Sequence, residues 1–192
     1  MSEAEDKIIL ATVECIEEYG INGTTIRRIG DKAGMNSAAI NYYFRSKDAL
    51  MERVFSTTLN NAFDWEDFIY TENMPLKEQL NEIFVFLSVK SIEYRNISRA
   101  HFYEIIEHEN YNTMITVRMN AFLEKVFSEV KRKKPDLPDG RIRMALTQLA
   151  AATLPFFSIY ANLFDTFSGL DMDRAENRAK YVKSLVETLA WD

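Results

Sequence analysis

Residues 24–50 read TTIRRIGDKAGMNSAAINYYFRSKDAL, and this stretch decides the fold of the N-terminal part of the chain. It contains two short helical patterns, one ending at Ala33 and one following Asn36, with Gly34 in the turn between them. Glycine suits that turn because it adopts the left-handed backbone conformation that other residues resist. Two short helices joined by such a turn predict a helix-turn-helix, whose second helix enters the major groove of DNA.

The outward side chains of these two helices have the chemistry that DNA contacts need. Small residues at the start of the second helix allow close approach to the bases, and the Asn41 amide can read adenine. Thr24 and Thr25 can offer hydroxyls and backbone N–H groups to a phosphate. The residues predicted to contact DNA are Thr24, Thr25, Arg27, Arg28, Ser37, Ala38, Ala39, Asn41, Tyr42, Tyr43 and Lys47. The alternative is a plain bundle, because short helices with glycine turns are common and paired tyrosines often only pack.

The charge of the chain is distributed unevenly. The 192 residues contain 23 Lys and Arg against 29 Asp and Glu, a net charge of -6. Residues 24–47, the basic segment, carry five cationic side chains and only Asp31 as an acid, a net charge of +4. The other 168 residues therefore carry -10. A basic segment on an acidic body indicates a specific anionic partner better than the total does.

The remaining sequence is helical in pattern and shows no alternating strands. Residues 3–19 have apolar side chains at three- and four-residue spacing, and Gly20 ends that pattern. Further helices are expected over 25–33, after Asn36, and over 47–63, 76–94, 96–109, 112–132 and 172–190, with a long uncharged helix within 144–164. The fold class is therefore all-α, with a three-helix head followed by an antiparallel helical bundle.

Several classes of protein are excluded or made unfavourable by composition. Cys15 is the only cysteine, so no intrachain disulfide can form and a reducing, cytoplasmic compartment is favoured. Residues 144–164 lack charge over 21 positions and are long enough to span a bilayer. Polar residues and alanines interrupt them without flanking charge clusters, so a buried core helix is favoured over a membrane span. No motif of an enzyme or a cofactor site occurs, and we expect neither catalysis nor a cofactor.

The stretch from Thr25 to Leu50 follows the patterns T-[IV]-R-x-I-x-x-x-A-G and I-N-Y-Y-F-x-S-K-x-x-L. It resembles the tetracycline-repressor (TetR) family, specifically over about residues 8–54. The resemblance implies about nine helices, a homodimer, a DNA-binding domain over residues 1–46 and a ligand-binding and dimerisation domain over 47–192. It also implies operator contacts by all the residues listed above except Thr24 and Arg28. Gly30 departs from the usual alanine at a helix-propensity cost of about 1 kcal/mol.

The resemblance makes the last two helices the dimer interface. Positions 175, 179, 182, 186 and 189 recur at heptad spacing, and the preceding helix has no charged face, so both helices need partners. An internal bundle could satisfy the same pattern. The predicted interface residues are Leu149, Phe156, Ala175, Ala179, Val182, Val186 and Leu189.

An apolar pocket with a few polar groups is expected in the aromatic-rich C-terminal part. Pro155 should kink its helix and open space beside Phe156. The residues predicted to line the pocket are Phe84, His101, Tyr103, Phe122, Phe156 and Tyr160. His101, Glu104 and His108 share one helix face, but no further ligand can be located, so no metal site is predicted.

These observations predict a cytoplasmic homodimeric transcriptional regulator, with repression as the favoured mode. It would bind double-stranded, palindromic operator DNA and be released by a small, largely apolar effector. The alternative is a helical protein–protein interaction module whose head is regulated by a partner protein. The sequence identifies neither operator nor effector.

Overall fold

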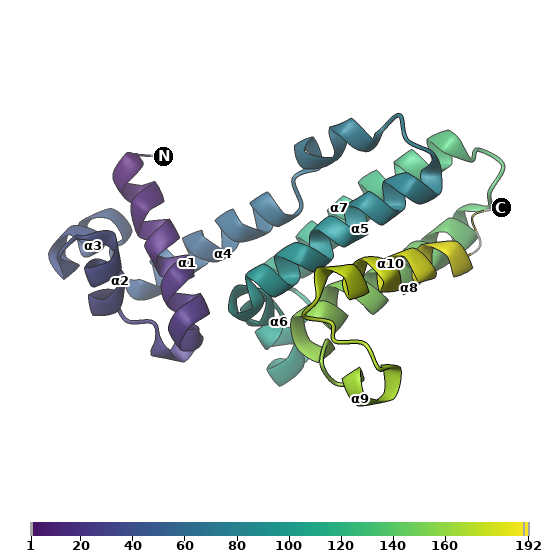
Figure 1. The fold of residues 1–192 in the computed structure, drawn as a ribbon. Coiled ribbons are helices and arrows are strands. Elements are labelled where there is room, and N and C mark those ends of the chain that lie inside the picture. The colour runs from purple at the N-terminus through teal and green to yellow at the C-terminus, as the bar shows by residue number, and fades with distance from the viewer. Residues whose placement is uncertain (1, 190, 192) are drawn as a thin grey trace.

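The computed structural model describes residues 2–189 and 191 and confirms the all-α class (Figure 1). Within those residues there are ten α-helices rather than about nine, together with a 3₁₀ segment, η1, and a π-helical segment, η2. The elements are α1 (Glu3–Gly23), α2 (Ile26–Ala33), α3 (Ser37–Phe44), α4 (Lys47–Ala62), η1 (Trp65–Thr71), α5 (Leu76–Glu93), α6 (Arg95–His108), α7 (Met114–Lys133), α8 (Asp139–Pro155), η2 (Phe156–Tyr160), α9 (Asp165–Ser168) and α10 (Ala175–Thr188).

Helices α1–α3 form the head at one end of the molecule, and α5–α10 form the bundle at the other, with α4 running between them (Figure 1). The head packs around fully buried Ile8, Ile16, Ile29 and Ile40. Its apolar cluster also takes in the first half of α4 and one residue of α6. The domain boundary after residue 46 stays a prediction, since the packing is continuous across it.

Two glycines in the head have backbone angles that explain their presence. Gly20 has φ 70° and ψ 171°, which interrupts α1 where the sequence predicts its end, and one further turn follows. Gly34 ends α2 with φ 64° and ψ 35°, the left-handed conformation predicted for the turn. The expected helix-turn-helix backbone is therefore present.

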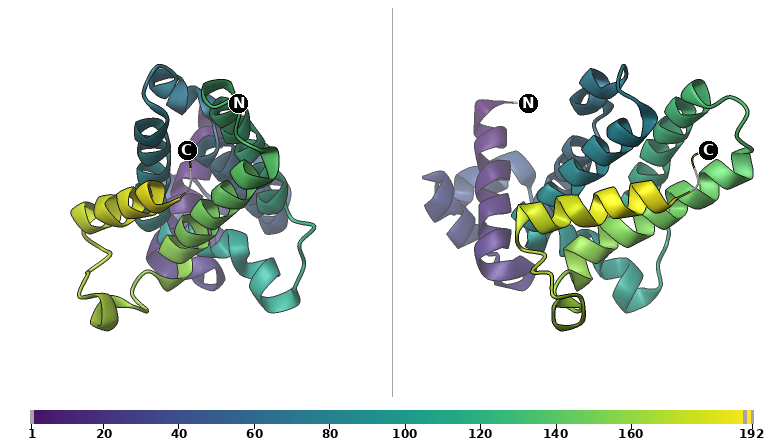
Figure 2. Two further views of the ribbon diagram at one scale, coloured as in Figure 1. Left: turned by 90° about the vertical axis from the view of Figure 1, so that its right-hand side faces the viewer. Right: turned by 45° about the vertical axis from the view of Figure 1, so that its right-hand side comes forward.

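The bundle packs η1, α5, α7, α8 and α10 around one large apolar core. Phe68, Phe84, Phe157 and Trp191 are among its fully buried side chains. Helix α9 projects away from this core on the connection between η2 and α10 (Figure 2). Neither η1 nor α9 was expected from the sequence, because both are too short to give a helical periodicity.

The helix changes its geometry at Pro155, while the kink and the space predicted beside Phe156 stay predictions. Pro155 ends α8, and the chain continues as the π-helical segment η2. The Tyr181 hydroxyl donates to the carbonyl of Ala152 at 3.1 Å, and Arg99 Nε donates to the carbonyl of Ser158 at 3.0 Å. Side chains from α10 and α6 thus donate to backbone carbonyls on either side of this change in helix geometry.

The long apolar helix is packed inside the protein. Asp139–Tyr160 is long and apolar enough to cross a membrane, with mean hydropathy 1.3 over its most apolar window, and it is the one such helix found in the described residues. Of its most apolar stretch, 56% is buried within the chain. The first turns of the helix carry the charged residues Asp139, Arg141 and Arg143. This packing agrees with a core helix.

The predicted last helix, 172–190, begins later, at Ala175, and residue 190 lies outside the described part.

Candidate nucleic-acid interface and ligand cavity

Side chains of the turn itself build the helix-turn-helix. Thr25 caps α2 by accepting from the Arg28 N–H at 3.3 Å, and Asn36 caps α3 by accepting from the Ala39 N–H at 2.8 Å. A Cβ added at Gly30 would lie 2.6 Å from the carbonyl oxygen of Met35. The glycine that departs from the family pattern therefore permits close contact between α2 and the turn.

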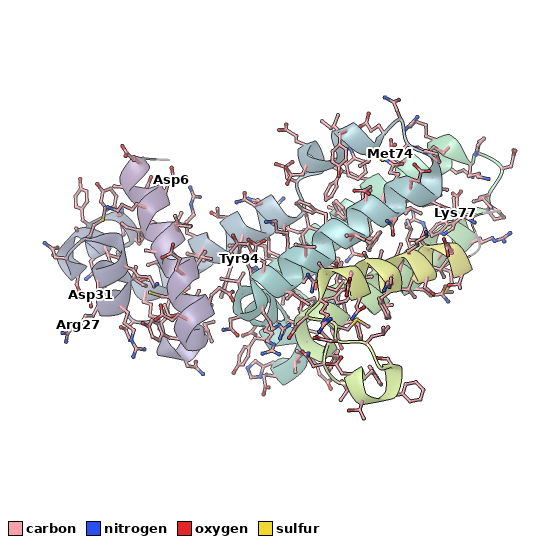
Figure 3. All side chains as sticks on the ribbon, viewed as in Figure 1. Asp6, Arg27, Asp31, Met74, Lys77 and Tyr94 are labelled. Carbon is pink, nitrogen blue, oxygen red and sulfur yellow. The ribbon has the colours of Figure 1, made fainter. Side chains whose placement is uncertain are left out.

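Most of the predicted DNA-contacting residues lie on the outer surface of the head. Arg27 extends from its far end (Figure 3), and Tyr42 is 81% exposed on α3. The exposed members are Thr25, Arg27, Arg28, Ser37, Ala38, Asn41, Tyr42 and Tyr43, while Ala39 and Lys47 are partly buried. No DNA is present, so their contacts stay predictions.

Thr24 is the exception, and its predicted phosphate contact is wrong. Its side chain is completely buried, and its hydroxyl donates to the carbonyl of Gly20 at 2.9 Å. The break at Gly20 turns this hydroxyl back into the head, so it cannot reach a phosphate.

Contacts with α1 organise the charge of the basic segment. Lys32 pairs with Glu18 at 2.9 Å and with Glu14 at 3.7 Å, and the hydrogen bond to Glu18 raises the pKa of Lys32. The Arg28 guanidinium lies 4.3 Å from the centre of the Tyr19 ring and donates to the carbonyl of Gly23. Tyr19, which ends the apolar pattern predicted over residues 3–19, is 42% exposed and its ring contacts Arg28.

The heptad seam of α10 faces the core of its own chain. Leu149, Val182 and Val186 are at most 1% exposed and belong to the bundle core, so they offer no surface to a second copy. Their predicted role in the dimer interface is wrong, because the internal bundle satisfies the pattern. Ala175 is exposed, while Phe156, Ala179 and Leu189 are partly buried.

A cavity of about 570 Å³ lies at the junction of head and bundle. Its walls come mainly from α1, α4, α5 and α6, and its lining includes Asp6 of α1 and Tyr94, which follows α5. Figure 3 labels both residues. Among the predicted pocket residues, only His101 lines the cavity. Phe84 and Phe122 belong to the bundle core, Phe156 stacks on Tyr181, and Tyr103 and Tyr160 are nearly half exposed. Those five assignments are wrong for this cavity.

His101 is held by α4. Its Nε2 lies 3.0 Å from the hydroxyl of Thr58, and its ring packs edge-on against Phe55 with centroids 5.2 Å apart. Burial lowers the pKa of His101 to about 4, so the ring is neutral at pH 7. Among residues 2–189 and 191, no group of three His, Cys, Asp or Glu side chains is arranged to hold a metal ion.

A second link joins the head to the bundle. The Glu17 carboxylate of α1 accepts from the backbone N–H groups of Asn96 and Ile97 at 3.1 and 2.8 Å, and the Asn96 amide donates to the carbonyl of Glu17 at 2.9 Å. Sequence reasoning missed Glu17 and Thr58. Their partners are 80 and 43 positions away, and no local pattern marks such pairs.

Comparison with known proteins identifies a family that the N-terminal part of the chain resembles. The family model described as bacterial regulatory proteins, tetR family, matches residues 8–54, which contain the helix-turn-helix. The N-terminal head is therefore similar to the DNA-binding part of these regulators. As a family of regulatory proteins rather than enzymes, the matched family agrees with the expectation that the chain is not an enzyme.

The curated relatives whose match extends beyond the head have low sequence identity to this chain. The HTH-type transcriptional regulator YttP of Bacillus subtilis is 30% identical over 128 residues, 63% of this chain and 58% of YttP. The repressor KstR2 of Mycolicibacterium smegmatis is 29% identical over 92 residues, 47% of this chain and 44% of KstR2. The chain thus spans about half the length of these curated relatives.

Solved structures agree over almost the whole fold. A TetR-family transcriptional regulator from Mesorhizobium loti superposes with a TM-score of 0.71 at 15% identity, covering 98% of this chain and 97% of the other. At this identity the likeness establishes the fold alone.

Proposed function

We propose that the chain is a cytoplasmic transcriptional regulator that binds a palindromic operator as a homodimer, with α3 in the major groove. The observation that carries the proposal is the outer face of α3, where Ser37, Ala38, Asn41 and Tyr42 are all exposed. Cationic Arg27 and Arg28 stand on the neighbouring helix. Small residues and an amide at the centre suit base edges, and flanking cations suit phosphates. The name of KstR2 as a repressor supports repression as the mode.

The proposed dimer surface is the outer face of α8 rather than the α10 seam. Met144 is 61% exposed there, and Thr147, Gln148 and Ala151 are exposed on the same face. This strip has no charged side chain, so a second copy could cover it without burying an unpaired charge. Two-fold symmetry of the dimer would then match the symmetry of a palindrome.

The proposed effector is a small, largely apolar molecule that binds in the cavity beside α6. Helix α6 lines the cavity and is bonded to α1 through Glu17. An effector that favours one placement of α6 would therefore also favour one placement of the head. Release from the operator would be a shift in population between two head spacings.

The DNA-binding proposal is tested on the DNA that flanks the coding gene, by anisotropy titration over a range of salt concentrations. Binding should weaken steeply with salt, and Lys47→Ala should lower the salt slope by about one unit. Lys77→Ala is the matched control, because Lys77 is exposed at the opposite end of the molecule (Figure 3). Binding that is absent, or insensitive to salt, would refute the proposal.

The base-reading role is tested with Asn41→Ala. The variant should bind with relaxed preference among operator sequences altered at one base pair, a change of about 1–3 kcal/mol in discrimination at that position. A uniform loss of affinity for all sequences would show that Asn41 contacts only the backbone.

The dimer surface is tested by light scattering coupled to size-exclusion chromatography. Ala151→Glu places a charge on the exposed face of α8 and should produce a monomer. Ala121→Glu makes the same change at an exposed position of α7 and should leave the dimer intact. If the Ala151→Glu variant stayed dimeric, the proposal that α8 forms the dimer interface would be contradicted.

A further inference from the structure

The cavity at the junction of head and bundle has the DNA-binding head as one of its walls. Ile9, Leu10 and Val13 of α1 line it opposite residues of α5 and α6. Leu10 is 60% exposed, so its side chain is accessible to a molecule in the cavity. A molecule in the cavity would therefore contact the head directly.

Charged side chains line only the rim of this cavity. They are Asp6, Asp67 and Lys90, of which both carboxylates are exposed. Lys90 pairs with Glu93 at 2.8 Å, so its charge is already neutralised, and it lies 5.6 Å from the centre of the Tyr94 ring. All other lining residues are uncharged, including the buried Leu87, Ile97 and Phe102. A charged group carried into the interior would lose its hydration without gaining a counter-charge.

The Thr58–His101 pair determines which hydrogen bond the interior offers. The Thr58 hydroxyl lies 3.0 Å from the carbonyl of Val54, 3.2 Å from that of Phe55 and 3.0 Å from His101 Nε2. A hydroxyl has one proton, and the two carbonyls can only accept it. If the Thr58 proton is assigned to a carbonyl, Thr58 is the acceptor and His101 Nε2–H donates to it. In the neutral ring this leaves Nδ1 as an acceptor.

We propose that this cavity binds an uncharged, largely apolar molecule bearing a hydroxyl group, which donates to Nδ1 of His101 while the apolar body lies against Leu10 and Val13 of α1. The inference rests on the proposed function, because it names the chemical class of the effector. It adds that the effector contacts the head itself. A hydroxyl matches the acceptor, and the uncharged walls reject carboxylates and ammonium groups of the same chain length.

The ligand class is tested by calorimetric titration with 1-decanol, decanoate and decyltrimethylammonium at pH 7. Decanol should bind at least about ten times more tightly than either charged compound, because only the neutral head group enters the interior without losing hydration uncompensated. Equal or tighter binding of a charged compound, or no binding of decanol, would overturn the proposal.

The role of His101 is tested by comparing 1-decanol with 1-methoxydecane, which accepts a hydrogen bond but cannot donate one. In the unmodified protein decanol should bind about five times more tightly than the ether. In His101→Phe this ratio should fall to about one, whatever the variant does to overall affinity. A ratio that survives the substitution would place the hydroxyl elsewhere.

The wall contributed by the head is tested with Leu10→Asp, which should weaken decanol binding about tenfold or more. Val117→Asp is the matched control, since Val117 is 63% exposed on α7 and does not line the cavity. Equal effects of the two variants would overturn the contact with α1. DNA titration of the same samples separates the proposals: decanol binding without DNA binding would refute the regulator, and the reverse would refute only the effector class.

Discussion

Glu17 of the head accepts a hydrogen bond from the backbone N–H of Ile97, in the first turn of α6, at 2.8 Å. The first N–H groups of a helix have no partner inside it, and a carboxylate there also interacts favourably with the helix dipole. Tyr94, which stands at the N-cap position of α6, provides no side-chain cap. A residue about 80 positions earlier in the chain therefore supplies the cap and ties α1 to α6.

Replacing Glu17 should loosen this tie. We expect Glu17→Ala to lower the free energy of unfolding by about 1–2 kcal/mol, because two backbone N–H groups lose their acceptor. Urea unfolding measures the change. Glu14→Ala is the control on the same helix, and it should cost less than about 0.5 kcal/mol, because the 3.7 Å contact of Glu14 with Lys32 is an exposed ion pair. Equal losses in the free energy of unfolding would show that the Glu17 cap on α6 stabilises the protein no more than an exposed ion pair does.

Gly30→Ala should destabilise the head although alanine is the better helix former. The added Cβ would lie 2.6 Å from the backbone oxygen of Met35, so the turn must shift, at a cost of about 1–3 kcal/mol. Gly140→Ala is the control, because a Cβ at Gly140 meets nothing within 4 Å. That variant should gain up to about 1 kcal/mol from helix propensity. A stabilised Gly30→Ala variant in urea unfolding would contradict the contact with the turn.

Local sequence was sufficient to predict the helix-turn-helix. The turn at Gly34 and the inward direction of Ile29 and Ile40 follow from spacing and backbone preference alone. Thr24 and Thr25 could not be distinguished in this way. They are adjacent hydroxyls at one helix start, and only the break at Gly20 decides that Thr24 turns inward.

The cavity and the dimer surface could not be predicted because they depend on packing between distant segments. Phe84 and His101 are equally plausible pocket residues by type, yet the first fills the core and the second lines the cavity. The heptad spacing of α10 correctly predicts that one face of this helix packs against a partner. The pattern does not state whether its partner is the same chain or a second copy, and Val182 and Val186 pack within the chain.

The two threonines of the head should respond differently to loss of the hydroxyl. Thr24→Val removes the bond to the carbonyl of Gly20 and should cost about 1 kcal/mol of stability, with no change in DNA affinity or salt slope. Thr25→Val removes the α2 cap at a similar cost but should also weaken DNA binding, because Thr25 is exposed on the proposed interface. Urea unfolding and anisotropy titration measure the two effects. Weaker DNA binding by folded Thr24→Val would show that Thr24 contributes to the DNA interface after all.

His101 should make the stability of the protein depend on pH between about 4 and 6.5. Burial lowers its pKa to about 4 in the folded chain, whereas an ordinary histidine titrates near 6.5. Between these values the unfolded chain binds the proton and the folded chain does not, so stability rises with pH. The contribution is complete above pH 6.5, declines as the pH falls, and is lost once the pH is below 4. Between pH 7 and pH 5 it amounts to about 2 kcal/mol.

The variant His101→Gln should therefore lose about 2 kcal/mol less than the unmodified chain when urea unfolding at pH 7 is compared with unfolding at pH 5. The difference between two pH values matters here, because the substitution also removes the contact with Thr58 at both. His108→Gln is the matched control: His108 is exposed on the same helix, so this variant should keep the full pH dependence. If His101→Gln kept it as well, the proton would bind to some other group, and the ring could not be the neutral acceptor that the proposed hydroxyl contact requires.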